Sequence, residues 1–343
     1  MNERKALEKG QYILLSAKDN TLCPKKFRIE NVINSGSTVI CYEASNEEGC
    51  CGVLKEFYPK TAYGLERDFR GQLIHSDEYR ASFRRFAEAE KEYISAYEML
   101  AHERENGEYP ELKTFIPYFE IYCGCDENGT KAGSTYIWTP NRQVETFDIL
   151  CRDIQACPHK EPEKKLILVL SAVKTLTQCI CFLHSAGMIH RDIKPSNFGF
   201  VRQKNEPLIS SISIVDVDSI CSVYSCPERT VFTKGYDEPE IDEELPCNQT
   251  DIYSIGATLF HAVINTPETC KNGFVFRHEF YDGIQDMVGR SELVRASKIN
   301  SNPYVTHMLT VILKKSLCRR EYRYPNCEEL LKDLNSILSF LLK

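Results

Sequence analysis

The octapeptide His190-Arg191-Asp192-Ile193-Lys194-Pro195-Ser196-Asn197 places an acid, a cation and an amide close together in the chain. Phosphoryl transfer needs such a set, because a hydroxyl must be oriented toward the phosphate while the charge on the transferred group is neutralised. An ordinary polar loop after a helix is the alternative, but it would not require so many positions to agree at once. The octapeptide therefore predicts a phosphoryl-transfer site.

The residues before the octapeptide predict a long buried helix. Between Leu166 and Leu183 apolar residues recur at every third or fourth position, which is the spacing of one helix face. Gly187 follows closely and is a typical stop signal. We expect this helix to hold the reacting groups in place.

The octapeptide resembles the catalytic loop of the protein kinase superfamily, and Lys194, two residues after the acid, is its serine/threonine-type form. The resemblance implies that Asp192 accepts the proton of the substrate hydroxyl and that Lys194 holds the γ-phosphate of ATP. It also implies that Asn197 binds Mg²⁺ or Mn²⁺.

A second metal ligand is expected at the end of the next apolar strand, Ile212–Val217. Asp216 corresponds to the acid of the family's Asp-Phe-Gly motif, whereas Val217 and Asp218 replace the other two residues. A strand-end acid that caps a turn is the alternative for Asp216 taken alone. The polar stretch between, 202–207, predicts an inserted hairpin.

The nucleotide-binding half resembles the family less closely. Val53-Leu54-Lys55-Glu56-Phe57 predicts a strand, and its Lys is similar to the one that pairs with the α- and β-phosphates. The segment 33–42 resembles the glycine-rich loop that covers the phosphates, with Gly36 at its central glycine and Asn34 and Val39 at the other two. The resemblance implies nucleotide contacts at Ile33, Gly36, Cys41, Val53, Lys55 and Thr139. Cys41 takes the place of the valine above the adenine, and Thr139 lies near the gatekeeper position before the hinge.

Active kinases pair this lysine with a glutamate on a helix, and the sequence predicts that helix over 79–100. The helix offers three acids: Glu88, Glu90 and Glu92. Only Glu90 is followed three and four positions later by apolar residues, Tyr93 and Ile94, so it is the one expected to face the interior. We assign Glu90 as the partner of Lys55 and the other two acids to a solvated face.

Thr233-Lys234-Gly235-Tyr236-Asp237-Glu238-Pro239-Glu240 resembles the end of a kinase activation segment, with Glu238 where alanine is usual. The resemblance implies that Thr233 contacts the catalytic Asp and Lys, as in kinases that act on serine or threonine. It also implies that Asp251 anchors the backbone of the catalytic loop from a buried helix. Arg323 matches the arginine that pairs with the glutamate ending the segment, in a geometry that can be bidentate.

Arg191 implies regulation, because a kinase arginine at this position commonly receives a phosphate from the activation segment. The candidate acceptors are Ser219, Ser222, Tyr224, Ser225 and Thr230. The acid-rich run 237–244 favours either basic substrates or, as charge runs usually do, only solvation.

These motifs predict an α+β, bilobal, protein-kinase-like fold. A tail is expected over 1–10, with an extra strand beginning at Gln11. The ATP-binding small lobe, 11–141, is expected to be an antiparallel β-sheet with one main helix and an inserted hairpin or loop over 61–78. The large lobe, 142–343, is expected to be mainly α-helical.

Length, charge and composition limit which further domains, partners and compartments are expected. A chain of 343 residues has room for one such two-lobed domain and little else, and its net charge of −7 disfavours nucleic-acid binding. We expect no stretch to span a membrane, since none approaches the roughly 20 apolar residues of a membrane helix, and the charged N-terminus is unlike a signal peptide. The spacing of the 16 cysteines lacks zinc-ribbon pairs, so we expect mostly buried, reduced thiols in a cytoplasmic protein.

Three functions fit the sequence. The leading hypothesis is an Mg-ATP-dependent serine/threonine protein kinase that also phosphorylates itself. The first alternative is a pseudokinase, a nucleotide-binding scaffold with little or no phosphotransfer, which the replaced glycines together with Val217 and Asp218 favour. A small-molecule kinase is the second alternative, and it is disfavoured by Lys194 and by the segment that ends at Glu240. The substrate and the oligomeric state are not encoded in any recognisable motif.

Overall fold

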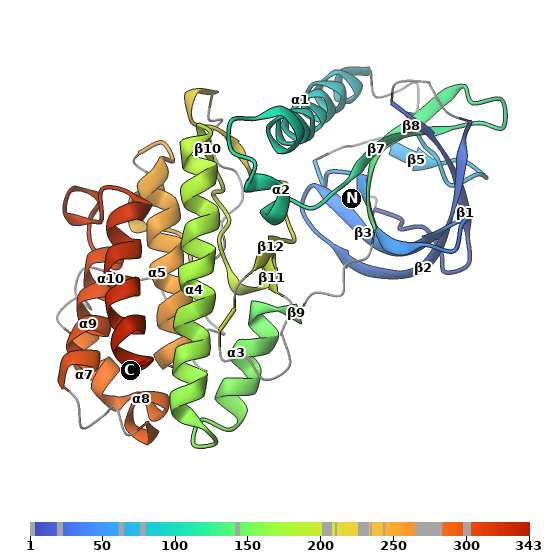
Figure 1. The fold of residues 1–343 in the computed structure, drawn as a ribbon. Helices are drawn as coiled ribbons and strands as arrows, with labels where there is room; N and C mark the ends of the chain where they lie inside the picture. Colours follow the sequence, from blue (N-terminus) through green and yellow to red (C-terminus); the bar gives the residue numbers. More distant parts are fainter. Residues whose placement is uncertain are drawn as a thin grey trace. The chain divides into compact units, whose positions relative to one another are not determined.

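Six strands of the N-terminal part pair into a closed antiparallel barrel in the computed structural model (Figure 1). Their order around the barrel is β1 (Tyr12–Ala17), β2 (Lys25–Ser35), β3 (Val39–Asn46), β4 (Cys51–Phe57), β8 (Lys131–Pro140) and β7 (Glu120–Cys125). The structure describes residues 4–18, 23–61, 65–75, 80–140, 145–200, 208–209, 211–225, 233, 235–242, 244–264, 283–297 and 303–343. The chain divides into unit 1, Met1–His102 with Pro117–Gln143, and unit 2, Glu103–Ile116 with Val144–Lys343.

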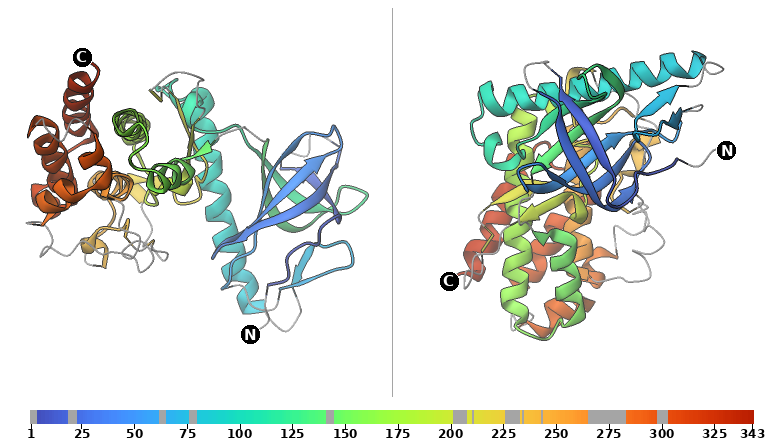
Figure 2. Two further views of the ribbon diagram at one scale, coloured as in Figure 1. Left: turned by 90° about the horizontal axis from the view of Figure 1, so that it is seen from below. Right: turned by 90° about the vertical axis from the view of Figure 1, so that its right-hand side faces the viewer.

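The small lobe was expected to be an antiparallel β-sheet, and in the structure this sheet closes into a barrel. The extra strand β1 pairs with β2 on one side and with β7 on the other, where Leu15 lies opposite Gly124. Side chains alternate between the two faces of a strand, and the residues that point inward are fully or almost fully buried: Phe27, Ile40, Tyr42, Leu54, Tyr136 and Trp138. The barrel, whose ring of strands is visible in Figure 2, therefore has a largely aromatic interior that also encloses the carboxylate of Glu56.

The segment after β4 contains a hairpin and then the main helix of unit 1. β5 (Leu65–Arg67) pairs with β6 (Leu73–His75), which confirms the inserted hairpin within the described residues. α1 (Arg80–Asn106) packs its aromatic side chains on the outer face of the sheet, where Phe57 meets Phe86 and Tyr93 at ring distances of 5.3 and 5.0 Å.

Residues 4–10 do not form the expected tail. From Arg4 to Gly10 the chain packs against the barrel, and Leu7 is only 1% exposed. The backbone N–H of Leu7 donates to the hydroxyl of Tyr42 at 3.1 Å, and that of Gly10 donates to the carbonyl of Ile29 at 2.7 Å. An apolar side chain that fits against the barrel wall outweighs the charged composition of this segment.

Unit 2 is mainly helical, as expected. Its helices are α2 (Leu112–Phe115), α3 (Phe147–Ala156), α4 (Pro162–Ser185), α5 (Asn248–Ile264), α7 (Ile284–Arg290), α8 (Glu292–Ala296), α9 (Pro303–Leu317) and α10 (Cys327–Leu341). The short strands are β9 (Glu145–Thr146), β10 (Met188–Ile189), β11 (Phe198–Phe200), β12 (Ile212–Ile214) and β13 (Cys221–Ser222). Short 3-10 turns are η2 (Pro195–Asn197), η3 (Val223–Ser225), η4 (Pro239–Asp242) and η7 (Arg320–Tyr322).

α4 is the predicted long helix and forms the core of unit 2 together with α5, α9 and α10 (Figure 1). Contrary to expectation, this helix is long and apolar enough to meet the length and composition criteria for a membrane span. Two-thirds of that window is buried inside the protein, which is the behaviour of a core helix. α5 is buried along its length from Thr250 onward.

The cysteines among the described residues are free thiols, and Cys179 and Cys327 are among those fully buried. Others are exposed, including Cys50, in the turn between β3 and β4, and Cys51, the first residue of β4. The expectation of buried, reduced thiols is therefore correct only in part. The predicted hairpin at 202–207 lies outside the described residues.

Candidate active site

The octapeptide follows directly from α4 and the turn at Gly187, whose φ of 70° is a left-handed conformation that suits glycine. Strand β10 then leads into residues 190–194, and the turn η2 ends at Asn197. Ile193 is fully buried. The apolar residues of the loop thus fix it to unit 2 and leave Asp192 and Lys194 partly exposed.

Asp192, Lys194 and Thr233 form a closed triangle of polar contacts. Lys194 Nζ lies 2.8 Å from Asp192 Oδ2 and donates to Thr233 Oγ1 at 3.1 Å. The Thr233 hydroxyl in turn donates to Asp192 Oδ1 at 2.8 Å. The contact of Thr233 with the expected acid and lysine is therefore confirmed, although its neighbour Lys234 lies outside the described residues.

The triangle determines the charge of Asp192. Burial would raise the pKa of this carboxyl, but the Lys194 ammonium and the hydrogen bond from Thr233 together hold it below the ordinary aspartate value. Asp192 is therefore ionised at neutral pH and able to accept a proton or a hydrogen bond.

Asn197 is held so that its amide nitrogen faces Asp192. Its Nδ2 donates to the Asp192 carbonyl and to Asp192 Oδ2, both at 2.9 Å. The backbone N–H of Val215 donates to the Asn197 carbonyl at 2.8 Å, because β11 and β12 pair beside it. This pairing brings Asp216, one residue further, close to Asn197.

The donor set fits a magnesium ion. Asn197 Oδ1 and the carboxylate of Asp216 are the hard oxygen ligands that Mg²⁺ prefers, and Mg²⁺ usually takes one or two protein ligands plus substrate phosphates. No cluster of three or more His, Cys, Asp or Glu residues suited to a metal occurs among the described residues. A metal held by these two residues would depend on the phosphates for its remaining ligands.

Asp251, on the buried helix α5, anchors the backbone of the loop. Its Oδ2 accepts from the N–H of His190 at 2.8 Å, and its Oδ1 accepts from the N–H of Arg191 at 2.8 Å. His184 Nε2, on α4, lies 2.9 Å from Oδ2. Burial would raise the pKa of Asp251, but these donors hold it below the usual value. Arg191 has a φ of 67°, which is uncommon for a residue with a side chain and is maintained by these bonds.

Arg191 faces the first part of the activation segment. Its Nε donates to the carbonyl of Ser219 at 2.7 Å. Among the candidate phosphate acceptors, Tyr224 is 91% exposed, whereas Thr230 lies outside the described residues. The phosphorylation site stays a prediction.

The end of the activation segment contains a charge cluster larger than expected. Arg323 contacts Glu240 at 3.3 Å, as predicted, but it also pairs with Glu238. Arg320 forms a second pair with Glu238, with Nε 3.0 Å from Oε2. Against the effect of burial, the two guanidinium groups and the Thr250 hydroxyl lower the pKa of Glu238.

Sequence reasoning missed Arg320. The available signal was Glu238 itself, because an acid in place of alanine at a buried position needs a cation as partner. Glu238 is only 1% exposed. The acid is therefore neutralised within unit 2, so the proposed attraction of basic substrates would depend on the other acids of the run.

In unit 1, four of the expected nucleotide-binding residues share one face of the barrel wall. Cys41 lies directly opposite Lys55, and Val53 lies directly opposite Thr139. Val53 and Lys55 are two apart on β4, so their side chains point to the same side. Cys41 and Lys55 are 8% and 7% exposed.

The expected phosphate loop joins β2 to β3. Ile33 falls where the pairing of the two strands shifts register, and its side chain is 52% exposed. Gly36 is at the turn, whereas Val39 is a paired strand residue opposite Phe57. Val39 at a glycine position therefore belongs to the strand and not to the turn.

Glu90 lies on the same side of the sheet as Lys55. Its Oε1 accepts from the backbone N–H of Thr135 at 2.8 Å, and Thr135 is two residues along β8 from Ile137, the partner of Lys55. Burial raises the pKa of Glu90 above its ordinary value. The direct pair of Glu90 with Lys55 stays a prediction.

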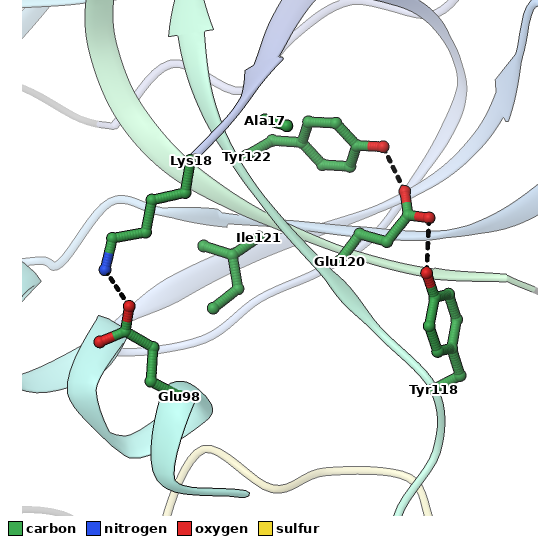
Figure 3. A pocket seen from close by; sticks show the side chains of 7 residues that line it. All are labelled: Ala17, Lys18, Glu98, Tyr118, Glu120, Ile121 and Tyr122. Carbon is green, nitrogen blue, oxygen red and sulfur yellow. Dashed lines mark hydrogen bonds and ion pairs between the residues drawn. The ribbon is translucent and has the colours of Figure 1, made fainter. Parts of the chain in front are cut away.

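A separate pocket of about 580 Å³ opens beside the ends of β1 and β7, as Figure 3 shows. Glu120 accepts hydrogen bonds from Tyr118, at 2.8 Å, and from Tyr122, while Lys18 pairs with Glu98 on α1. None of the residues expected to bind nucleotide lines this pocket.

Comparison with protein families gives a match to the model described as protein kinase domain, over residues 153–334. Among curated proteins, the serine/threonine-protein kinase PknD of Protochlamydia amoebophila is 27% identical over 196 residues, which cover 50% of this chain and 19% of that protein. Mitogen-activated protein kinase kinase kinase 8 of Rattus norvegicus is 32% identical over 107 residues, covering 30% and 21% of the two chains. The chain thus spans about a fifth of the length of these relatives.

Solved structures show the same fold. The BubR1 kinase domain aligns with 99% of this chain and 86% of its own, with a TM-score of 0.57 and 13% identity. A rhoptry kinase from Toxoplasma gondii aligns with 97% and 86%, with a TM-score of 0.58 and 12% identity. At such low identity the likeness concerns the fold alone.

Proposed function

Because this chain belongs to the protein kinase family, we propose that it transfers the γ-phosphate of ATP to serine or threonine hydroxyls of protein substrates. The observation that carries the proposal is the triangle of Asp192, Lys194 and Thr233, in which an ionised acid and a lysine are fixed by a threonine hydroxyl. The sequence relatives named as serine/threonine kinases support the choice of acceptor.

In the proposed reaction, Asp192 accepts a hydrogen bond from the substrate hydroxyl, orients it and takes its proton. The bond from the hydroxyl oxygen to the γ-phosphorus forms as the bond between that phosphorus and the bridging oxygen breaks, and ADP leaves. General-base help of this kind contributes about 10²–10⁴-fold. Lys194 neutralises charge on the transferred phosphoryl group. Asp251 acts indirectly, as a positioning residue. Its hydrogen bonds from the backbone of His190 and Arg191 keep the loop in the conformation that presents Asp192.

Magnesium would supply charge neutralisation between the phosphates, with Asn197 Oδ1 and Asp216 as its protein ligands. The bonds from Asn197 Nδ2 to Asp192 support this role, since they direct the amide nitrogen toward Asp192 and leave the amide oxygen with only a long contact, 3.4 Å, from the Ser196 hydroxyl among its described hydrogen bonds. In unit 1, the shared face of Cys41, Val53, Lys55 and Thr139 would receive the nucleotide. Glu90 would pair with Lys55 once a nucleotide is bound.

The second candidate is a nucleotide-binding scaffold with little phosphotransfer. The observation that favours it is the replacement of the Phe and Gly after Asp216. Val217 is 3% exposed and Asp218 N–H donates to Asp216 Oδ1 at 3.3 Å, so this acid is held by its own turn. A scaffold would bind ATP without turnover.

The test is transfer of labelled γ-phosphate from ATP, with Mg²⁺ or Mn²⁺, to the protein itself and to a basic generic substrate. Wild-type protein is compared with Asp192→Asn and with Asp148→Asn, a control whose carboxylate forms only a surface pair with Arg152 on α3. Label on serine or threonine in the wild type and the control, but not in Asp192→Asn, supports the kinase. Thermal stabilisation by ATP without label under either metal supports the scaffold.

A further inference from the structure

The segment Arg4–Gly10 reaches the phosphate loop through Arg4. Its Nη2 donates to the hydroxyl of Ser35 at 2.8 Å and to the carbonyl of Gly36. Its Nη1 donates to the carbonyl of Tyr58, and the guanidinium carbon lies 5.7 Å from the centre of the Tyr58 ring. One side chain from the start of the chain therefore connects the turn between β2 and β3 with the end of β4.

The same turn is held from its other side by backbone hydrogen bonds. The N–H of Tyr58 donates to the carbonyl of Thr38 at 3.0 Å, and that of Lys60 donates to the carbonyl of Ser37 at 2.8 Å. Arg4 adds the contact to Gly36, which these bonds do not reach.

The contact with the Gly36 carbonyl sets the direction of the next peptide N–H. A peptide unit is planar, and the described residues contain no cis bond. The carbonyl of Gly36 and the N–H of Ser37 therefore point in opposite directions. When the carbonyl is bound by Arg4, the N–H of Ser37 is presented on the side of the loop away from Arg4. Backbone N–H groups of such turns are the groups that bind phosphates.

A second arginine holds the backbone next to Arg4. Arg67, on the inserted hairpin, donates to the carbonyl of Lys5 and to both oxygens of the buried Glu56, at 2.8 and 2.6 Å. It also donates to the carbonyl of Gly71 at 2.6 Å. Glu56 is fully buried and also accepts from Tyr42 and Tyr136, each at 2.7 Å. The N-terminal segment is thus fastened to the barrel interior one residue from Arg4.

We propose that Arg4 is a positioning residue that orients the phosphate loop for the phosphates of a nucleotide, with Arg67 as its anchor. The loop has Asn34 and Val39 where its family has glycines. The hydrogen bonds from Arg4 would therefore fix the backbone conformation of a loop that lacks two of the three usual glycines. The proposal rests on the proposed function in that it requires nucleotide binding by unit 1.

The experiment compares the affinities of Arg4→Ala and wild-type protein for MgATP and for adenosine, measured by calorimetry. We expect about a tenfold loss for MgATP, the size of about one misplaced hydrogen bond to a charged group. Adenosine has no phosphates, so its affinity is expected to stay within about twofold. Lys9→Ala is the matched control, because Lys9 lies in the same segment and contacts only Asn31, at 3.2 Å, in its described hydrogen bonds.

Amide hydrogen exchange over residues 33–40 of the ligand-free protein gives a second readout that does not need turnover. Exchange is expected to be faster in Arg4→Ala than in wild type and unchanged in Lys9→Ala. An Arg4→Lys variant, which keeps the charge but cannot span two carbonyls, is expected to be intermediate.

Three results would overturn the inference. Equal affinities of Arg4→Ala and wild type for MgATP would show that the contact does not position the loop. An equal loss for adenosine and MgATP would indicate a general structural defect instead. Failure of wild-type protein to bind either ligand would refute the proposed function together with this inference, whereas the first two results refute the inference alone.

Discussion

The two acids expected to act in the reaction have pKa values shifted in opposite directions. Asp192, in unit 2, is held below the ordinary aspartate value by Lys194 and Thr233 despite its burial. The pKa of Glu90, in unit 1, is raised by burial, and the described hydrogen bond of this carboxylate comes from the backbone N–H of Thr135. The surroundings of Asp192 therefore favour its ionised form without any ligand. The surroundings of Glu90 instead favour its protonated form.

The same contrast extends to the surroundings of each acid. In unit 2, the loop that carries Asp192 is bonded to a fully buried carboxylate, Asp251, and the activation segment ends in a cluster of two arginines around Glu238. In unit 1, a buried ion pair joins Glu56 to Arg67, and it lies on the inner face of β4, opposite to the face of Lys55. Unit 1 thus uses these charges to hold the barrel and the N-terminal segment, on the side of β4 opposite to the face proposed to receive the nucleotide.

The largest expected effect comes from removing the anchor of the catalytic loop. Asp251→Ala leaves the buried N–H groups of His190 and Arg191 without an acceptor, and each such group costs about 1–3 kcal/mol. We expect the free energy of unfolding to fall by about 4 kcal/mol, measured by urea titration. Asp286→Ala, in an exposed pair with Arg290, is the matched control and should change it by less than about 0.5 kcal/mol. A loss below 1 kcal/mol for Asp251→Ala would show that Asp251 does not anchor the loop that carries Asp192, and the contrast between units 1 and 2 would then fail.

The next effect concerns the cluster at the end of the activation segment. Glu238→Ala restores the usual family residue but leaves the fully buried Arg323 with less compensation, so we expect a loss of about 3 kcal/mol. Adding Arg320→Ala should cost less than the sum of the two single changes, with a coupling of about 1–3 kcal/mol in a double-mutant cycle. Glu244→Ala removes only an exposed partner of Arg320 and should be nearly neutral. Strict additivity of Glu238 and Arg320 would show that the cluster does not act as one unit.

Contacts between residues close in the sequence could be predicted from the sequence, whereas contacts between distant residues could not. Asp192, Lys194 and Asn197 belong to one short motif, so their mutual contacts follow from local chain geometry. Arg320 and Glu238 are 82 positions apart, and no periodicity links them. The pair of Arg67 with Glu56 was missed for a related reason.

Glu56 alternates with Lys55 along a strand and would be solvated on an open sheet. Only closure of the barrel through β1 makes its side of β4 an interior, and closure depends on the pairing of strands distant in sequence. The face shared by Cys41 and Lys55, in contrast, depends on one hairpin, and the sequence predicted both as nucleotide-binding residues. Their roles stay predictions until nucleotide binding is measured.

A moderate effect is expected for the hydroxyl of Thr233. Thr233→Val removes one of the groups that lower the pKa of Asp192, so that pKa should rise toward its ordinary value and the acid limb of the pH–rate profile should move to higher pH. The rate of phosphate transfer at neutral pH should fall about tenfold, because Asp192 and Lys194 each lose a fixed partner. Thr233→Ser keeps the hydroxyl and should retain both the rate and the profile. An acid limb that does not move in Thr233→Val would mean that the hydroxyl does not tune Asp192.

The smallest expected effect concerns Glu90 in unit 1. Here the substitution is expected to raise the free energy of unfolding, whereas the substitutions of Asp251 and Glu238 lower it. The pKa of Glu90 is raised in the folded protein above the ordinary glutamate value of 4.5, so the ionised carboxylate destabilises the fold at neutral pH. Glu90→Gln keeps an acceptor for the Thr135 N–H and should raise the free energy of unfolding at pH 7 by up to about 1 kcal/mol. As pH falls through the folded pKa toward 4.5, wild-type Glu90 becomes protonated and the two proteins should converge in stability. Glu92→Gln, on the exposed face of α1, should show neither change. If Glu90→Gln lowers the stability at pH 7, then a cation already compensates Glu90 in the free protein, and unit 1 is as fully arranged for its reaction as unit 2.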